Sequence, residues 1–587
     1  MDLQLNQKLD MITKGLSFKI KGSYNSSYTI YKNGAVTKAT YTPVLQGDGT
    51  IAYRKYGDEG PISYSESYGK ARNWYFESSL NYHRAFGKHT VGGLLLYNQS
   101  KEYYPGTYSD IPHGYVGLVG RATYDYDNKY MLEFNVGYNG SENFAPGKRY
   151  GTFPAVSVGW VVSEEKFWEP LKNVVNFLKL RASYGLVGND VIGGSRFMYT
   201  ADPYVIDSNG LISRGYRGYS FGNSTTSAAL WKGAYESARN NPDLTWEHAY
   251  KQDYGFDANF LNDRLRTTFD YYYEHRTDIL LTDYTAPDYI GYTLPLVNAG
   301  IVNSHGWELS LKWNDKIGKN MRYWIETNLS YNQNKVIERK EAPVKNSYMA
   351  SKGHRLGSRS LYKLFGFYSE KTNEEYRAKY GVDMPIQLAG DNLKYGDCVY
   401  VDLDGDGKID SNDMSRELGY TDDPEYMAGI NIGFKWKNLS VNTQWTAAWN
   451  VSRLIEDVFR QPFVSASSTT QGGLLQYLVD HTWTADNPDF KAKYPRATWA
   501  NANNNYASST LYDQDSKYLR LKTLQIAYDM HFPWMKAIGA KNIQVALSGY
   551  NLLTFTPYLW GDPEVRASSS PTYPLQRTYT ISLKVGF

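Results

Sequence analysis

The sequence predicts an all-β protein, a transmembrane antiparallel β-barrel that crosses its membrane with strands. Apolar and polar residues alternate with a period of two in about 17 segments along the 587-residue chain. No apolar run approaches the roughly 18 residues that a membrane helix requires, whereas a membrane strand needs only about 9–11. The connections between these segments also alternate between short and long, which is typical of a membrane barrel.

The alternation is clearest in LSFKIKGSY at residues 16–24, where Leu16, Phe18 and Ile20 share one face and lysines and serines share the other. The same pattern recurs at residues 130–139, 178–184, 307–313, 430–436 and 543–548. Near Thr523 the phase slips by one residue, which predicts a β-bulge. The chain contains 55 tyrosines but has a mean hydropathy of −0.56. This combination fits strands that carry an apolar face and a polar face, with aromatic residues at their ends.

The connections separate into two kinds in strict order. Short turns are predicted at residues 127–128, 261–264, 314–320 and 437–438, and long connections at 189–244, 275–302, 334–423 and 451–515. Outer-membrane barrels place short turns in the periplasm and long loops outside the cell. The alternative is a large secreted β-sandwich or propeller array. Its alternating strands would be mixed with fully buried apolar strands, of which the sequence has few.

Composition and motifs exclude several classes of function. The net charge of +3 and the pI of about 8.3 do not indicate strong electrostatic attraction to nucleic acid. The single Cys398 excludes an intrachain disulfide framework. The nine histidines are scattered, and neither H-E-x-x-H nor G-x-S-x-G occurs. We therefore predict that the chain is not an enzyme. The residues after Met1, DLQLNQKLDM, lack the basic start and apolar core of a signal peptide.

The segment VDLDGDGKIDSND at residues 401–413 has the spacing of a calcium-binding loop. The predicted ligands are the side chains of Asp402, Asp404, Asp406, Asp410 and Asp413 and the carbonyl of Lys408, with Gly407 at the sharp turn. The last position holds aspartate where glutamate is usual, which predicts weaker binding. Amphipathic helices do not flank the loop, so we expect calcium to brace it structurally. The alternative is an acidic, solvated turn without an ion.

Several longer stretches of the chain carry a family pattern. They are the segment that begins GYVGLVGRATYDYDNKY at residues 114–165, FLKLRASYGLVGN at 177–189, NPDLTWEHAYKQDYGFDANFLNDRL at 241–265, YLRLKTLQIAYDM at 518–530 and SGYNLLTFTPYLWGDPEV at 548–565. These stretches resemble the SusC/RagA family of TonB-dependent outer-membrane transporters. The acidic loop also falls where that family often carries a similar segment. The closing YTISLKVGF, which ends on Phe587, looks like the C-terminal signal that the barrel-assembly machinery recognises.

The resemblance implies a barrel of about 22 strands that is filled by a plug, and a place in the outer membrane of a Gram-negative bacterium. It also implies energy from TonB, ExbB and ExbD, a SusD-like lipoprotein lid, and oligosaccharide or peptide as cargo. Signal peptide, TonB box and plug do not occur in this sequence. We therefore expect residues 1–587 to be the C-terminal part of such a barrel, with about 17 of the strands. Within it, residues 334–423 are expected to form a long extracellular loop.

Aromatic residues in the long connections are candidates for contact with a sugar ring. They are Trp231, Tyr235, Tyr284, Tyr289 and Trp499. For each, the alternative role is packing within its loop or in an aromatic girdle at the membrane interface. The predicted function is import of oligosaccharides or peptides into the periplasm. A passive porin and a calcium-dependent surface adhesin that binds glycans are the alternatives.

Overall fold

The computed structural model describes most of the 587 residues. Outside the described part are residues 107–109, 192–194, 201–203, 207–218, 221–229, 232–233, 237–238, 286–293, 463–474, 487–491, 500, 534, 536–538, 566–572 and 587. In the short strands at 204–206, 219–220, 230–231 and 234–236 only the backbone is described. Phe587, the proposed assembly signal, therefore lies outside the described residues.

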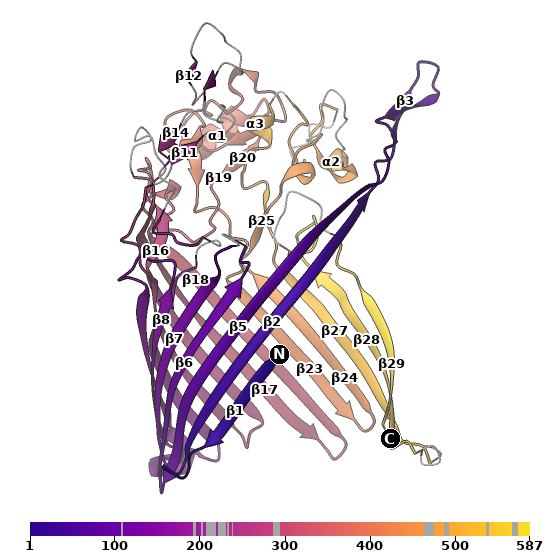
Figure 1. Cartoon of the computed structure of the whole chain (residues 1–587). Coiled ribbons are helices and arrows are strands. Elements are labelled where there is room, and N and C mark those ends of the chain that lie inside the picture. Colours follow the sequence, from indigo (N-terminus) through magenta and orange to yellow (C-terminus); the bar gives the residue numbers. More distant parts are fainter. Residues whose placement is uncertain are drawn as a thin grey trace.

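One antiparallel sheet of 17 strands forms the wall of the molecule (Figure 1). Its strands are β1 (Asp2–Lys8), β2 (Leu16–Ala35), β5 (Ser63–Phe86), β6 (His89–Tyr103), β7 (His113–Tyr126), β8 (Tyr130–Ser141), β9 (Tyr150–Val161), β10 (Val175–Asn189), β15 (Glu247–Phe260), β16 (Leu265–Thr282), β17 (Leu296–Ile317), β18 (Met321–Glu338), β23 (Tyr426–Trp436), β24 (Leu439–Trp449), β27 (Tyr518–Met530), β28 (Asn542–Phe555) and β29 (Thr578–Gly586). Each strand pairs with the next one in this order. The predicted all-β fold is confirmed.

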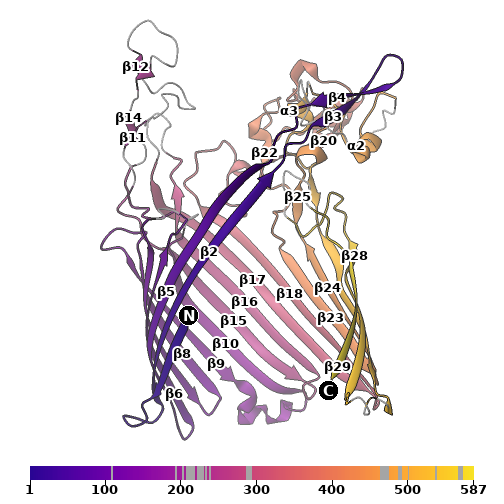
Figure 2. The same ribbon diagram turned by 45° about the vertical axis from the view of Figure 1, so that its right-hand side comes forward.

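The sheet curls round until its first and last strands approach the same side of the molecule (Figure 2). Among the described residues, β29 pairs with β28 and β1 pairs with β2, and no ladder joins β29 to β1. The result is a tilted, curled barrel wall whose two edge strands are not hydrogen-bonded to each other. No helix in the described part of the chain is both long and apolar enough to cross a membrane.

The two faces of the sheet have opposite chemistry. On β10, Leu180 and Tyr184 are 41% and 48% exposed although they are apolar and aromatic. Between them Arg181 points to the other face, where its guanidinium forms ion pairs with Asp257 at 3.0 Å and Asp270 at 2.7 Å. Exposed apolar side chains outside and paired charges inside reverse the arrangement of a soluble protein. The period of two in the sequence therefore corresponds to an apolar outer face and a polar lumen.

Turn chemistry and register agree with the sequence. Three residues connect β7 to β8, and the first two, Asp127 and Asn128, both have a φ of 55°, the left-handed conformation that tight hairpin turns use. Against β24 the register shifts between Leu521 and Thr523, which leaves Lys522 of β27 as the extra residue. Against β28 the register shifts at the same place, but there two residues of β28, Asn551 and Leu552, stand opposite Lys522. The predicted bulge near Thr523 is therefore present. Inserting one residue returns the later apolar residues of β27 to the outer face.

The long connections begin later than the sequence pattern indicates. The prediction placed one at 275–302, but β16 and β17 stay paired up to Thr282 and Leu296. Likewise β18 runs to Glu338 and β23 begins at Tyr426, whereas 334–423 was predicted to be loop. Strand pairing continues past the apolar band because a ladder needs only backbone partners. Apolar alternation marks the membrane-spanning part of a strand and misses this extension.

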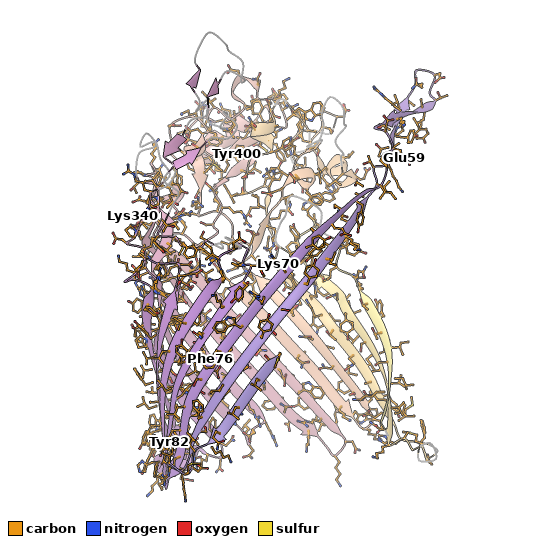
Figure 3. All side chains as sticks on the ribbon, in the orientation of Figure 1. Glu59, Lys70, Phe76, Tyr82, Lys340 and Tyr400 are labelled. Atoms are coloured by element: carbon orange, nitrogen blue, oxygen red, sulfur yellow. The ribbon has the colours of Figure 1, made fainter. Side chains whose placement is uncertain are left out.

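The strands β2 and β5 form an arm that extends past the rest of the wall. All 20 residues of β2 pair with β5, and a small hairpin of β3 (Thr40–Leu45) and β4 (Ile51–Tyr56) caps the arm. Figure 3 places Tyr82 and Phe76 on the barrel wall, Lys70 near its upper rim and Glu59 at the distant end of the arm. Only the lower part of β2 therefore lies within the wall.

The described residues of two long connections, 339–425 and 450–517, fold together into a cap above the strands (Figure 1). Their elements include β19 (Leu361–Tyr362), β20 (Leu364–Phe367), α1 (Thr372–Tyr380), β21 (Cys398–Tyr400), β22 (Met414–Ser415), β25 (Ser452–Leu454), α2 (Gln476–His481), α3 (Ala502–Asn505) and β26 (Asp513–Asp515). Cys398 and Tyr400 from the first connection are fully buried, against Ala507 and Leu511 from the second. The Tyr400 hydroxyl donates to the Asn504 carbonyl at 2.6 Å. The cap thus has a core to which both connections contribute.

A buried carboxylate joins the two connections. Asp397 is 0% exposed and accepts hydrogen bonds from Arg496 at 2.9 Å, Asn501 at 2.7 Å and Asn505 at 2.9 Å. The backbone N–H of Lys394 donates a fourth, at 2.9 Å. A buried charge that is paired and fully hydrogen-bonded is stable only while every partner is present. Asp397 therefore fixes the second connection to the first.

We expect Phe134→Arg to destabilise the barrel in a bilayer by about 2–4 kcal/mol, because a charged side chain on the lipid face near mid-span must leave water. Phe134 is 48% exposed on the apolar face of β8, while the next residue, Asn135, lines a cavity on the inner face. Asn135→Arg is therefore the matched control and should have a much smaller effect. The measurement is reversible unfolding in phospholipid vesicles. Equal losses in both variants would contradict the assignment of the faces.

Asp397→Ala should open the cap and leave the barrel intact, because Arg496 and the two asparagines would lose their buried acceptor. We expect local opening to become easier by about 3–5 kcal/mol. Hydrogen exchange measured by mass spectrometry should show faster exchange in residues 394–398 and 496–505 and unchanged exchange in β15 to β18. The exposed Asp391 offers the control Asp391→Ala, which should exchange like the parent. Unchanged exchange in Asp397→Ala would show that the cap is held by other contacts.

Candidate functional site

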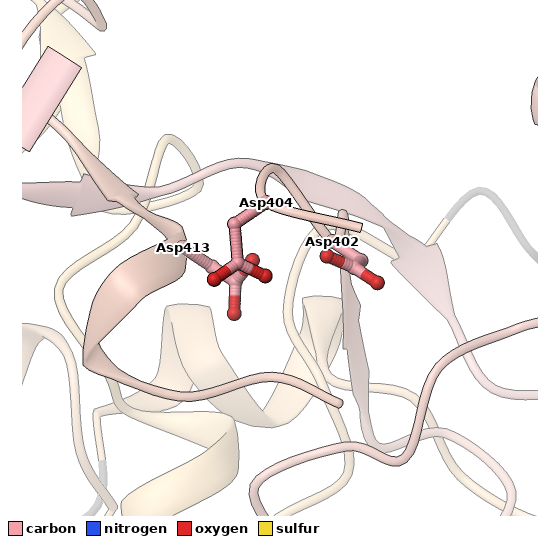
Figure 4. Close-up of side chains that lie close together, drawn as sticks. All are labelled: Asp402, Asp404 and Asp413. Atoms are coloured by element: carbon pink, nitrogen blue, oxygen red, sulfur yellow. The ribbon is translucent and has the colours of Figure 1, made fainter. Parts of the chain in front are cut away.

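The acidic loop lies in the cap, between β21 and β22. One carboxylate oxygen from each of Asp402, Asp404 and Asp413 can be chosen so that all lie within 4.8 Å of one another (Figure 4). Carboxylate oxygens are the hard ligands that calcium prefers, and it takes six to eight oxygens in total. These three residues therefore form a cluster whose chemistry suits a hard divalent cation, with backbone carbonyls and water as the other ligand types.

Backbone hydrogen bonds hold two of these carboxylates in place. Asp402 accepts from the N–H of Gly405 at 2.6 Å and of Gly407 at 2.9 Å. Gly407 has a φ of 85°, a conformation that favours glycine at this position. Asp413 accepts from the N–H of Leu403 at 2.7 Å and of Asp410 at 2.8 Å. The loop therefore curls around these two carboxylates.

Two lysines balance the charge of this loop. The Lys345 ammonium lies 2.5 Å from Asp404 and lowers the pKa of that carboxyl, whereas burial raises the pKa of Asp413. The Lys408 ammonium lies 2.7 Å from Asp410 and 3.7 Å from Asp406. Asp406 and Asp410 are not among the three clustered carboxylates, although the sequence predicts that five converge. Binding of an ion by these residues stays a prediction.

Lys345 was not identified from the sequence. It lies 59 residues before Asp404, in the same long connection but outside the motif. Only the fold of the cap brings its ammonium to the carboxylate cluster. The ion pair engages a carboxylate oxygen of Asp404, one of the three clustered residues.

The five aromatic candidates for cargo contact do not form one described site. Tyr284 and Trp499 are 62% and 66% exposed and belong to different connections. Trp231 and Tyr235 lie in the short strands β13 (Leu230–Trp231) and β14 (Ala234–Glu236), of which only the backbone is described. Tyr289 lies outside the described residues. Contact of these side chains with a sugar or peptide stays a prediction.

The lumen wall offers a polar surface that spacing motifs do not reveal. A cavity of about 750 Å³ on the inner face is lined by charged side chains of neighbouring strands, among them Arg181, Lys251, Asp253, Asp270, Glu274 and Glu308. A second cavity of about 470 Å³ shares Asp270 and Glu308. Each of these residues is one polar member of an alternating strand. Such a wall can hydrogen-bond a polar cargo or a polar domain that enters the barrel.

Comparison with known proteins gives a family match across the barrel. The family model described as "TonB dependent receptor-like, beta-barrel" matches residues 2–552. TonB-dependent receptor P3 of Formosa agariphila is 24% identical over 98% of this chain and 56% of its own length. TonB-dependent receptor SusC of Bacteroides thetaiotaomicron is 23% identical over 80% of this chain and 44% of its own length. The chain therefore spans about half the length of these relatives.

Solved structures show the same fold. The RagAB peptide importer in its "open-open" state superposes with a TM-score of 0.72 at 18% identity, over 100% of this chain and 61% of that one. A second RagAB peptide transporter structure gives a TM-score of 0.73 over 98% of this chain and 60% of that one.

The barrel wall, its apolar outer face and the family match point to one conclusion. Most of the described structure is strand, and 17 of the strands form one antiparallel sheet. The chain belongs to the TonB dependent receptor-like β-barrel family and forms a SusC-like barrel of the outer membrane.

Proposed function

We propose that the protein carrying this chain imports oligosaccharides or peptides across the outer membrane as a SusC-like TonB-dependent transporter. The observation that carries the proposal is the polar, charged lumen of a wide barrel beneath a folded cap. The RagAB peptide importer, which shares this fold, supports the peptide class. The oligosaccharide class rests on the resemblance to the SusC/RagA family. A charged wall suits a cargo rich in hydroxyl or amide groups, because such groups can replace the hydrogen bonds that they make in water.

In this proposal the chain supplies the barrel wall and the cap. A plug region and partner proteins supply the energy for transport and close the barrel. TonB, ExbB and ExbD act through a plug region that fills the lumen. A SusD-like lipoprotein closes over the cap and traps cargo against it. Exposed aromatic side chains such as Trp499 and Tyr284 offer the flat apolar faces on which sugar rings stack. Cargo passes when the plug is rearranged.

We also propose that calcium binds Asp402, Asp404 and Asp413 and braces the cap. Three carboxylates held this close repel one another, and a divalent cation removes that repulsion. Asp413 is 0% exposed, so its carboxylate is the most costly to keep charged without an ion. The loop lies between β21 and β22, whose partner strands β20 and β19 belong to the cap core. Fixing the loop therefore fixes the surface on which a lid would rest.

Uptake should depend on the proton-motive force and on TonB. Cells that express the full-length protein should accumulate labelled oligosaccharide or peptide, and uptake should stop in a strain that lacks TonB, because the plug then stays closed. A protonophore should have the same effect. A passive porin would continue to equilibrate the cargo under both conditions. That outcome would overturn the proposed function.

Calcium binding should require the three clustered carboxylates. Asp402→Asn combined with Asp404→Asn should weaken calcium binding roughly ten-fold or more, because two charged ligands are lost. Isothermal titration calorimetry on the purified full-length protein measures this. Asp410→Asn is the matched control, since that carboxylate is not one of the three clustered ones and asparagine can still accept the hydrogen bond from the Asn412 N–H. No heat of binding in the parent at millimolar calcium would mean that the loop is an acidic turn.

Replacing Lys345 should raise the calcium affinity, whereas replacing the aspartates should lower it. This variant therefore tests the same site independently. Lys345→Met removes the ammonium that competes for Asp404, and calcium affinity should rise roughly three-fold, the scale of an exposed ion pair. A fall in affinity would mean that Lys345 positions the loop and does not compete with the ion.

A further inference from the structure

The connection between β9 and β10 differs from the tight turns at the same end of the barrel. It forms two short 3-10 segments, η1 (Val162–Glu164) and η2 (Lys166–Leu171), and joins β10 at Val175. Figure 2 shows it as a coiled ribbon beside the lower ends of these strands. Three of its apolar side chains are exposed: Phe167 by 63%, Leu171 by 48% and Val174 by 56%.

This connection folds toward the outer face of the barrel. Trp160, 36% exposed, pairs on the ladder with Tyr130 on one side and Leu180 on the other, and all three belong to the apolar face. The Glu165 carboxylate accepts hydrogen bonds from the Tyr130 hydroxyl at 2.5 Å and from the Trp160 indole N–H at 3.3 Å. The ring of Phe167 lies edge-on to Trp160, with 6.5 Å between centroids. The exposed apolar group is therefore continuous with the lipid-facing band.

Hydrogen bonds to strand ends keep the connection ordered. The Trp168 indole donates to the Val175 carbonyl at 3.0 Å, and the N–H of Leu261, in the neighbouring turn, donates to the Val174 carbonyl at 2.9 Å. Leu261 is itself 43% exposed. Phe167 and its apolar neighbours are thus held at the surface by a fixed backbone. In water this arrangement would leave ordered apolar area unburied, which favours a partner that covers it.

The charges of the connection identify the kind of partner. Residues 162–174 contain three glutamates, at 164, 165 and 169, and two lysines, at 166 and 172. This near balance gives no strong attraction to an anionic surface. Aromatic rings with one polar tip, such as Tyr130, Trp160 and Trp168, favour the depth at which lipid headgroups meet acyl chains.

We propose that residues 162–174 are an interfacial anchor, which lies among the phospholipid headgroups of the periplasmic leaflet with Phe167 and Leu171 inserted at the acyl boundary. The assignment of the leaflet follows from the short turns, which face the periplasm in barrels of this kind. The anchor sets the depth of β9 and β10 in the bilayer. It does not depend on which cargo the protein carries or on whether calcium binds the cap.

Depth-dependent quenching tests the anchor in the full-length protein. The variant combines Phe167→Cys with Cys398→Ala, so that a thiol-reactive fluorophore labels position 167. The labelled protein is reconstituted in phosphatidylcholine vesicles whose acyl chains are brominated near the headgroup end. We expect quenching about three-fold stronger than for the same label at Lys319→Cys, in the exposed turn between β17 and β18. Replacing part of the lipid with phosphatidylglycerol should not change the ratio.

A second label position controls for any effect that replacing Phe167 itself has on the connection. A label at Leu171→Cys, with Phe167 retained, should be quenched to a similar extent. Adding Phe167→Ser to that protein should lower the quenching toward the Lys319 value. Equal quenching at 167, 171 and 319 would show that the connection projects into water, and the proposal would then be wrong.

Discussion

The structure depends on one constraint, which is that a backbone in lipid must satisfy its hydrogen bonds within the protein. Water is absent from the bilayer core, so each N–H and C=O needs a partner on the next strand. The 17 strands meet this requirement by pairing in chain order, each antiparallel to its neighbour. The alternation of side chains then follows, because a pleated strand turns successive residues to opposite faces. Leu180 faces lipid and Arg181 faces the lumen for this geometrical reason alone.

Both candidate sites depend on that wall. Charged residues such as Asp270 and Glu308 can lie on the inner face only because the outer face supplies the apolar surface that the membrane requires. The cap is a second structural unit with its own core, built from connections that the strands bring together at one end. Asp397 and Tyr400 belong to that core, so the acidic loop rests on a fixed base. The wall supports the cap, and the cap holds the carboxylate cluster.

The sequence was sufficient to predict those structural features that follow from a local pattern of residues. Period-two alternation predicted the strands, and a phase slip near Thr523 predicted the bulge at Lys522 against β24. It was insufficient to predict contacts between segments that lie far apart in the chain. Asp397 bonds Asn505, 108 residues away, and Lys345 bonds Asp404, 59 residues away; neither pair has a spacing that a motif could reveal. Strands also extended to Thr282 and Glu338, past the apolar band, because pairing outside the membrane leaves no hydrophobic signal.

The most direct test of the lipid-facing barrel wall is to measure, residue by residue along one strand in a bilayer, the accessibility to probes that dissolve in lipid or in water. Single cysteines placed from 178 to 184 on β10 can be spin-labelled and probed with oxygen, which concentrates in lipid, and with a water-soluble nickel complex. We expect positions 178, 180, 182 and 184 to respond to oxygen, and positions 179, 181 and 183 to respond to nickel. Uniform access to nickel, or protection from both probes at every position, would contradict a lipid-facing barrel wall.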